Sequence, residues 1–142
     1  MADTFRVDRY TATAKKSEIY SDFTTDFTPH PDTGDLVRSV NEDSVKRSMR
    51  NLIRTNRYER FFSPAKGSDV EATLFENITP QSQAKLQTGI RNLIENYEPR
   101  AKLVSVTVDA FPEKNAYVIT LVFYTVNKSE PQTLQLPLYR LR

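Results

Sequence analysis

The chain has 142 residues, of which 38% are hydrophobic, and its 20 basic and 18 acidic side chains give a formal net charge of +2. This length suits one domain with a single core, and so small a charge does not indicate the concentrated basic surface that nucleic acid requires. With no cysteine and one histidine, a disulfide framework and a thiolate metal site are excluded, and we expect no metal and no cofactor. No apolar run approaches the roughly 20 residues that cross a bilayer, so we expect no membrane partner.

Residues 1–37 have few aliphatic side chains and several turn-forming residues. Their aromatic side chains are widely spaced, at Tyr10, Tyr20, Phe23 and Phe27. This spacing predicts an extended N-terminal arm held by single rings rather than a regular element. We expect the part beyond Ile19 to dock, and we interpret residues 38–142 as one domain. A loose tail fits residues 1–16 equally well.

Two main helices and a short one are expected next. Asn41 and the two acidic residues after it predict a helix start, with the helix over about residues 42–55. The sequence from Ser68 to Glu71 has a capping pattern for a short helix that runs towards Phe75. Thr79 followed by Pro80 predicts a helix over about residues 80–97, which Pro99 ends. The inward stripe of the first helix is expected to consist of Val45, Met49, Leu52 and Ile53.

Beyond Pro99 the apolar period changes from that of a helix to that of a strand. Residues 103–110 alternate, residues 111–115 form a turn, and residues 116–126 are apolar on both faces. The latter pattern predicts a central strand with cover on both faces. Leu134, Leu136 and Leu138 alternate in a last strand, and Pro137 assigns this strand to an edge. Helices followed by an antiparallel three-stranded meander predict an α+β fold.

A basic stripe adjoins the apolar stripe of the first helix and comprises Lys46, Arg47, Arg50, Arg54 and Arg57. A solvated helix face, an acidic protein partner and nucleic acid are three explanations of it. No interleaved aromatic side chains support the nucleic-acid explanation, so we expect no nucleic-acid partner.

Glycoside hydrolysis needs only two carboxylates around a sugar cleft, and Glu59 and Glu98 are the candidates. Each stands beside an arginine, Arg60 or Arg100, and a neighbouring cation lowers a carboxyl pKa where a general acid needs it raised. Ionic roles are therefore favoured over catalytic ones. For Glu98-Pro99-Arg100 these roles are an intramolecular ion pair at a helix stop or an anchor for a partner, since the planar guanidinium makes paired hydrogen bonds to carboxylates.

Several short motifs occur in a characteristic order between residues 19 and 126. They are Tyr20-Ser21-Asp22-Phe23, Glu59-Arg60-Phe61-Phe62-Ser63-Pro64, Leu74-Phe75-Glu76-Asn77 and Asn96-Tyr97-Glu98-Pro99-Arg100. Together they resemble the baseplate wedge subunit, or sheath initiator, of contractile-tailed bacteriophages, which has relatives in type VI secretion baseplates. One departure is Tyr58, where many relatives carry glycine.

The resemblance implies a structural protein rather than an enzyme, located in the tail baseplate of a virion and assembled in the host cytoplasm. Its partners would be other baseplate wedge proteins, through their helical core bundle, and the tail sheath protein. Residues 116–138 would offer the sheath a strand edge. The protein-binding candidates are Glu98, Pro99, Arg100, Glu59, Arg60, Arg50 and Arg54. Because such proteins have sometimes carried a lysozyme label, a tail-associated, lysozyme-like glycoside hydrolase is the alternative.

Overall fold

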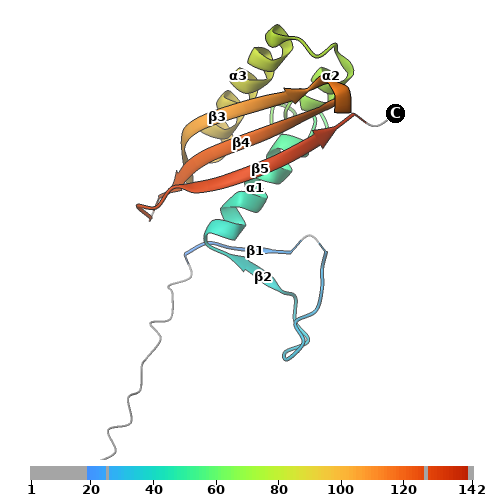
Figure 1. Cartoon of the computed structure of the whole chain (residues 1–142). Coiled ribbons are helices and arrows are strands. Elements are labelled where there is room, and N and C mark those ends of the chain that lie inside the picture. The colour runs from blue at the N-terminus through green and yellow to red at the C-terminus, as the bar shows by residue number, and fades with distance from the viewer. Residues whose placement is uncertain (1–18, 25, 127, 141–142) are drawn as a thin grey trace, which may run out of the picture.

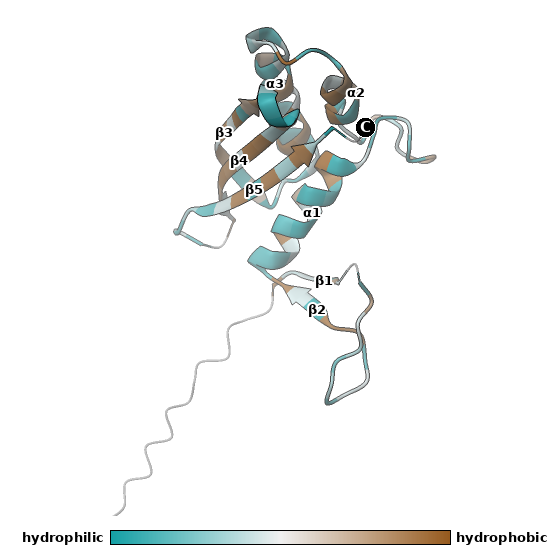
Figure 2. Cartoon of the chain, turned by 45° about the vertical axis from the view of Figure 1, so that its right-hand side comes forward, coloured by the Kyte–Doolittle hydropathy of each residue, from teal (hydrophilic) through white to brown (hydrophobic). Residues whose placement is uncertain are grey.

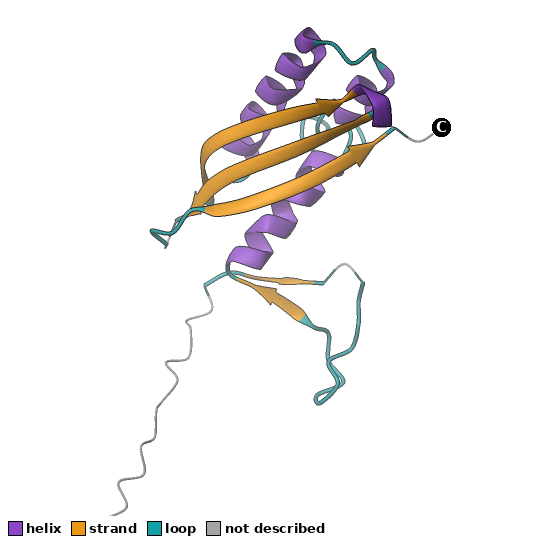
Figure 3. Cartoon of the chain, viewed as in Figure 1, coloured by secondary structure: helices purple, strands orange, loops and turns teal. Residues whose placement is uncertain are grey.

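A computed structural model describes residues 19–24, 26–126 and 128–140, so the expectations for residues 1–18 lie outside its described part. Helices lie on one side of a three-stranded antiparallel sheet, and a small hairpin precedes the first helix (Figures 1 and 3). The predicted α+β fold is confirmed. The elements are β1 (Ser21–Phe23), β2 (Arg38–Val40), α1 (Glu42–Arg54), α2 (Val70–Phe75), α3 (Pro80–Tyr97), β3 (Ala101–Phe111), the 3-10 turn η1 (Pro112–Lys114), β4 (Ala116–Thr125) and β5 (Gln132–Tyr139).

Asn41 precedes α1 as predicted, but its side chain makes no capping bond to the helix. The Oδ1 atom instead accepts hydrogen bonds from the backbone N–H groups of Ile19, at 2.9 Å, and Tyr20, at 3.4 Å. Its backbone has a positive φ of 50°, which is uncommon for a residue other than glycine. Asn41 therefore ties the start of the hairpin to the start of α1.

The segment expected as an extended arm supplies the first strand of a hairpin, in which Ser21 of β1 is opposite Val40 of β2. The hairpin stands apart from the sheet and projects beyond the start of α1 (Figures 1 and 2). Tyr20 packs against the core, as expected for a docked ring. Phe23 and Phe27 remain 55% and 67% exposed, so these two side chains do not dock on the described part of the chain.

The start of α3 is confirmed, with Pro80 in the first turn. The Thr79 hydroxyl accepts a hydrogen bond from the Ser82 N–H at 3.1 Å, and the Ser82 hydroxyl accepts one from the Thr79 N–H at 2.9 Å. Helix α2 is confirmed, but its predicted capping box is wrong. Its cap residue is Asp69, whose side chain makes no capping bond. The Ser68 hydroxyl donates to the backbone carbonyl of Ile53 and accepts a hydrogen bond from the Val70 N–H at 3.4 Å.

The sheet order is β3-β4-β5, which confirms β4 as the central strand and β5 as an edge strand. Tyr117, Ile119 and Leu121 on the inner face of β4 are fully buried and pack against the apolar side chains of α1 and α3. The predicted inward stripe of α1 is buried in the same core. On the outer face, Val118 and Val122 are half-buried. No described helix or strand covers this face of the sheet (Figure 3). The prediction of cover on both faces is therefore wrong.

The loop between α1 and α2 is closed at its base and open at its tip. The N–H of Ser68 donates to the Thr55 carbonyl at 2.9 Å, and the N–H of Tyr58 donates to the Pro64 carbonyl at 2.9 Å. Phe61 and Phe62 are fully exposed at the tip. A tightly packed base thus holds an aromatic tip in solvent.

Gly67 is the residue on which this base depends. A Cβ atom at Gly67 would lie 2.5 Å from the Asn56 carbonyl oxygen, so the backbone would have to shift. We expect Gly67→Ala to lower the free energy of unfolding by about 1–3 kcal/mol, as overpacking does. Gly89→Ala is the matched control. A Cβ there meets nothing within 4 Å, and alanine in α3 should raise stability by about 0.5–1 kcal/mol. Urea denaturation of both variants checks this, and equal stability of Gly67→Ala and the parent chain would contradict it.

Candidate protein-binding site

The chain turns sharply between α3 and β3, and the turn contains Glu98 and Arg100. The Glu98 N–H donates to the Ile94 carbonyl at 2.9 Å, which completes the last turn of α3. Pro99 cannot donate a backbone hydrogen bond and ends the helix. The Ala101 N–H then donates to the Glu98 carbonyl at 3.1 Å as β3 begins. The turn places the Glu98 side chain inside the protein, where it is 2% exposed.

Glu98 and Arg100 form a two-point ion pair. The Nε atom of Arg100 donates to Oε1 of Glu98 at 2.6 Å, and Nη2 donates to Oε2 at 2.8 Å. Burial alone would raise the pKa of Glu98, but hydrogen bonds from Arg100 and Ser48 and the charge of Arg100 outweigh it, so this pKa lies below its usual value. The hydrogen bond to Glu98 raises the pKa of Arg100. The pair is ionised throughout the physiological pH range.

Arg100 retains hydrogen-bonding capacity beyond this pair. A guanidinium group has five N–H donors, and the bonds to Glu98 use two positions, on Nε and Nη2. The other N–H groups make no hydrogen bond to a described residue, and the side chain is 32% exposed. The Tyr20 ring stacks on the guanidinium at 5.6 Å from its centroid. A buried anion thus holds a partly exposed cation in one orientation.

A pocket of about 380 Å³ surrounds this cation. Its lining comes from the hairpin, α1, the loop after α1 and the turn after α3: Asp22, Ser48, Asn51, Leu52, Arg60, Lys66, Tyr97, Glu98, Pro99 and Arg100. Glu98 neutralises the charge of Arg100. The other charged side chains of the lining are two cations, Arg60 and Lys66, and one anion, Asp22. The pocket therefore favours hydrogen-bond acceptors and negative charge.

The structure brings together four of the seven residues predicted for protein binding, namely Glu98, Pro99, Arg100 and Arg60. Glu59 does not line the pocket. Its side chain accepts a hydrogen bond from the Asn56 N–H at 2.8 Å and so stabilises the loop that carries Arg60.

Arg50 and Arg54 lie elsewhere, exposed on α1 and outside the pocket lining. Neither makes an ion pair within the described part of the chain. Two other members of the predicted basic stripe bind within the chain. Arg47 donates to the Phe23 carbonyl at 3.1 Å, and Arg57 pairs with Asp69 at 3.3 Å. The stripe is therefore not one continuous binding surface.

Sequence reasoning missed the contributions of Ser48 and Lys66. Ser48 carried a usable signal, since it lies three residues after Val45 and four before Leu52, in the apolar stripe of α1. A polar residue at such a position needs a buried partner, here Glu98. Lys66 lies in an irregular loop, where no periodicity indicates its direction.

The geometry does not suit Glu98 for the proton donation that glycoside hydrolysis requires. Both of its oxygens accept hydrogen bonds from Arg100, and its pKa is lowered rather than raised. Among the described residues, no group of His, Cys, Asp and Glu could hold a metal ion. No described helix is long and apolar enough to span a membrane.

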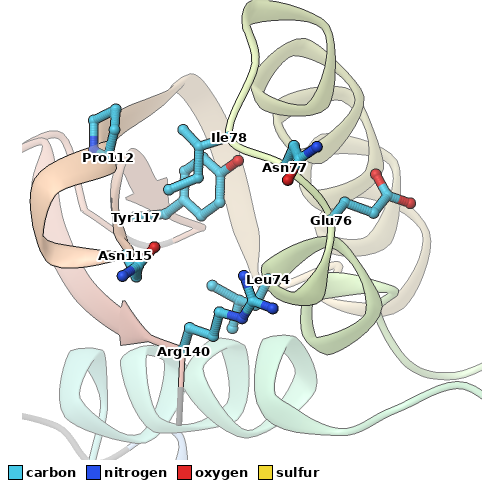
Figure 4. Close-up of a pocket in the computed structure, with 8 residues that line it drawn as sticks. All are labelled: Leu74, Glu76, Asn77, Ile78, Pro112, Asn115, Tyr117 and Arg140. Atoms are coloured by element: carbon cyan, nitrogen blue, oxygen red, sulfur yellow. The ribbon is translucent and has the colours of Figure 1, made fainter. Parts of the chain in front are cut away.

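A second pocket, of about 320 Å³, lies near the C-terminal end of β5 (Figure 4). It is lined by Leu74, Glu76, Asn77, Ile78, Pro112, Asn115, Tyr117 and Arg140. Its single carboxylate, Glu76, pairs with Lys85 at 3.2 Å, so the pocket offers no pair of acids for catalysis. The predicted protein-binding residues do not line it.

The Glu98 pair predicts a distinct acid dependence of stability. Because the folded pKa is lowered, the ionised carboxylate stabilises the fold fully above its ordinary value of 4.5, and this stabilisation is lost as the pH falls through the folded pKa. We expect Glu98→Gln to cost about 2 kcal/mol at pH 7 and to reduce the decline of stability below pH 4.5. Urea denaturation across a pH series measures both effects. Glu113→Gln, at an exposed position in η1, is the control and should keep the parent acid dependence. An unchanged decline in Glu98→Gln would contradict the buried pair.

Comparison with known proteins shows the family of this chain. The family model described as baseplate wedge protein gp25 matches residues 39–130. The baseplate wedge protein gp25 of Enterobacteria phage T4 is 29% identical over 96 residues, which cover 68% of this chain and 73% of that protein. The resemblance found from the sequence motifs is confirmed.

Solved structures share the fold. A Geobacter sulfurreducens protein solved as a candidate tail lysozyme has a TM-score of 0.66 and 22% identity, over 75% of this chain and 96% of that one. A chain of the anti-feeding prophage baseplate has a TM-score of 0.59 and 23% identity, over 83% of both chains. A chain of the type VI secretion baseplate complex has a TM-score of 0.61 and 18% identity, over 70% of this chain and 93% of that one. Because the family model spans most of the chain, from β2 to the turn before β5, this protein belongs to the baseplate wedge protein gp25 family and is a structural part of a baseplate.

Proposed function

We propose that this chain joins the wedge of a contractile-tail baseplate to the first ring of the tail sheath. Its pocket around Arg100 binds the helical core bundle of other wedge proteins, and its sheet receives a strand of the sheath protein. The chain works in the tail baseplate of a virion and is assembled in the host cytoplasm. The observation that carries the wedge contact is the partly exposed guanidinium of Arg100, fixed by buried Glu98 with donors left over.

The donor set indicates what the wedge partner presents. The free N–H groups of Arg100, together with Arg60 and Lys66, suit carboxylates or the unpaired carbonyls at a helix C-terminus. A helix C-terminus also carries a partial negative charge, which these cations attract. A helical bundle offers both kinds of acceptor at its ends.

The remaining predicted residues have supporting roles in this proposal. Pro99 shapes the turn, and Glu59 holds the loop that positions Arg60. Arg50 and Arg54, exposed on α1, provide a second contact for acidic side chains outside the pocket.

The sheet supports the sheath-initiation part of this proposal. A three-stranded antiparallel sheet ends in edge strands whose backbone groups can pair with an added strand. An added strand satisfies those groups and fixes the position of the subunit that supplies it. This provides a physical route from one wedge protein to an ordered ring.

We expect the variant Arg60→Ala/Lys66→Ala to weaken capture by the purified wedge complex at least tenfold, because charge-assisted hydrogen bonds contribute about 1.5–3 kcal/mol each. Both side chains lie at the pocket surface, so the fold should remain stable. Lys114→Glu in η1, outside the pocket lining, is the control. Arg100→Ala is less suitable, since it would leave the buried Glu98 carboxylate without its partner, at a cost of about 3–5 kcal/mol. Binding is measured by surface-immobilised titration, and unchanged affinity of the double variant would contradict the wedge contact.

A turnover assay on purified cell wall distinguishes the structural function from the alternative, a lysozyme-like glycoside hydrolase. We expect no release of soluble sugar by the parent chain. If the parent chain does release sugar and both Glu59→Gln and Glu98→Gln lose this activity, the enzymatic function is right and the structural one is wrong.

A further inference from the structure

The two edges of the sheet differ in their hydrogen bonding. Two glutamines of α3 reach the backbone of the edge strand β3, where the Gln83 side chain donates to the Val108 carbonyl and the Gln87 side chain donates to the Val106 carbonyl, the latter at 2.8 Å. Helix α3 packs along β3 (Figure 1). Two successive carbonyls on this edge are therefore already occupied by side chains of the same chain.

The strand register shows which groups of β5 are open. Residues along an antiparallel strand direct their backbone groups alternately to one neighbour and to the other side. Val106 and Val108 accept bonds from α3, so their backbone groups face away from β4. When this alternation is followed through the register of both strand pairs, the outward-facing residues of β5 are Thr133, Gln135, Pro137 and Tyr139.

Two independent observations agree with this assignment. Pro137, which has no N–H, falls on the outward side, where a proline does not interrupt the ladder to β4. The next residue after β5, Arg140, donates its N–H inward to the Asn115 carbonyl at 3.0 Å, as the alternation requires. The free edge of β5 thus offers N–H groups at Thr133, Gln135 and Tyr139.

We infer that strand addition occurs at β5 and that Gln83 and Gln87 seal β3 against it. This inference rests on the proposed function, because it names the edge and the kind of strand that sheath initiation uses. A strand paired with β3 would have to displace both glutamines. A strand paired with β5 would displace no side-chain bond that a described residue makes to the outward groups of β5. Covering one edge leaves the chain a single direction in which a sheet can grow. Strand β5 lies beyond the family match at residues 39–130.

The occupant is an extended segment of the sheath protein with alternating apolar and polar residues. Its side chains on the inner face would continue the row of Leu134, Leu136 and Leu138, which favours apolar residues. On the outer face its neighbours would be Thr133 and Gln135, which favour polar ones. Pro137 supplies no donor, so pairing is strongest over residues 133–135.

The variant Gln135→Pro tests whether the sheath strand pairs with β5, because it lacks one backbone N–H on the free edge. The substitution removes an outward N–H and leaves the ladder to β4 intact, and Pro137 shows that this side of β5 accommodates proline. We expect sheath attachment to assembled baseplates, counted by electron microscopy, to fall at least tenfold. Gln135→Ala, which keeps the N–H, should attach sheath like the parent chain. Normal attachment by Gln135→Pro would overturn the assignment to β5.

The sealing of β3 is tested on the purified full chain without sheath. Gln83→Met/Gln87→Met keeps the side-chain length but removes both donors, and Gln81→Met/Asn92→Met adds the same apolar groups at exposed positions of α3. Sedimentation at increasing concentration should show self-association at least tenfold stronger for the first variant than for the second. Equal behaviour would overturn the sealing role. Failure of the parent chain to attach sheath would contradict the proposed function itself, while the sedimentation result still decides whether α3 seals β3.

Discussion

The site depends on one buried ion pair, in which Glu98 holds Arg100 by two hydrogen bonds. A carboxylate that is 2% exposed is costly to bury alone, so the partly exposed guanidinium beside it must remain in place. The same guanidinium stacks on Tyr20 from the hairpin, and Ser48 from α1 also bonds to the carboxylate. Three parts of the chain that are distant in the sequence thus converge on one ion pair. The result is a positioned donor rather than a flexible surface charge.

This pair is also part of the sheet. The backbone carbonyl of Arg100 accepts a hydrogen bond from the Val126 N–H at 3.1 Å, next to the end of β4, and β3 begins at the following residue. A partner bound at the pocket, as proposed, would therefore hold the sheet directly, without an intervening loop. On the far side of β4, strand β5 is the edge whose outward groups no α3 glutamine occupies. A wedge contact and a sheath contact can in this way have a fixed geometry relative to each other.

Much of the fold could be predicted because its boundaries have local causes. Pro80 and Pro99 delimit α3, and alternating apolar residues define the strands. The tie from Asn41 to the hairpin could not be predicted, because a cap residue and a long-range tie have the same sequence pattern. For the site, the Glu98-Pro99-Arg100 turn was evident from the sequence, but the pocket around it needed a loop and a hairpin whose directions have no periodic signal. The role of Gln87 could not be predicted either. A helix residue that bonds to a strand edge and one that faces solvent are both polar, so the sequence does not distinguish them.

The most direct measurement is a reconstruction of the assembled baseplate at side-chain resolution. The account predicts that Arg100 keeps Glu98 on its Nε side while acceptor atoms of another wedge protein lie about 3 Å from its remaining donors. A pocket that stays open to solvent in the assembled particle, with the chain held through a different surface, would contradict it.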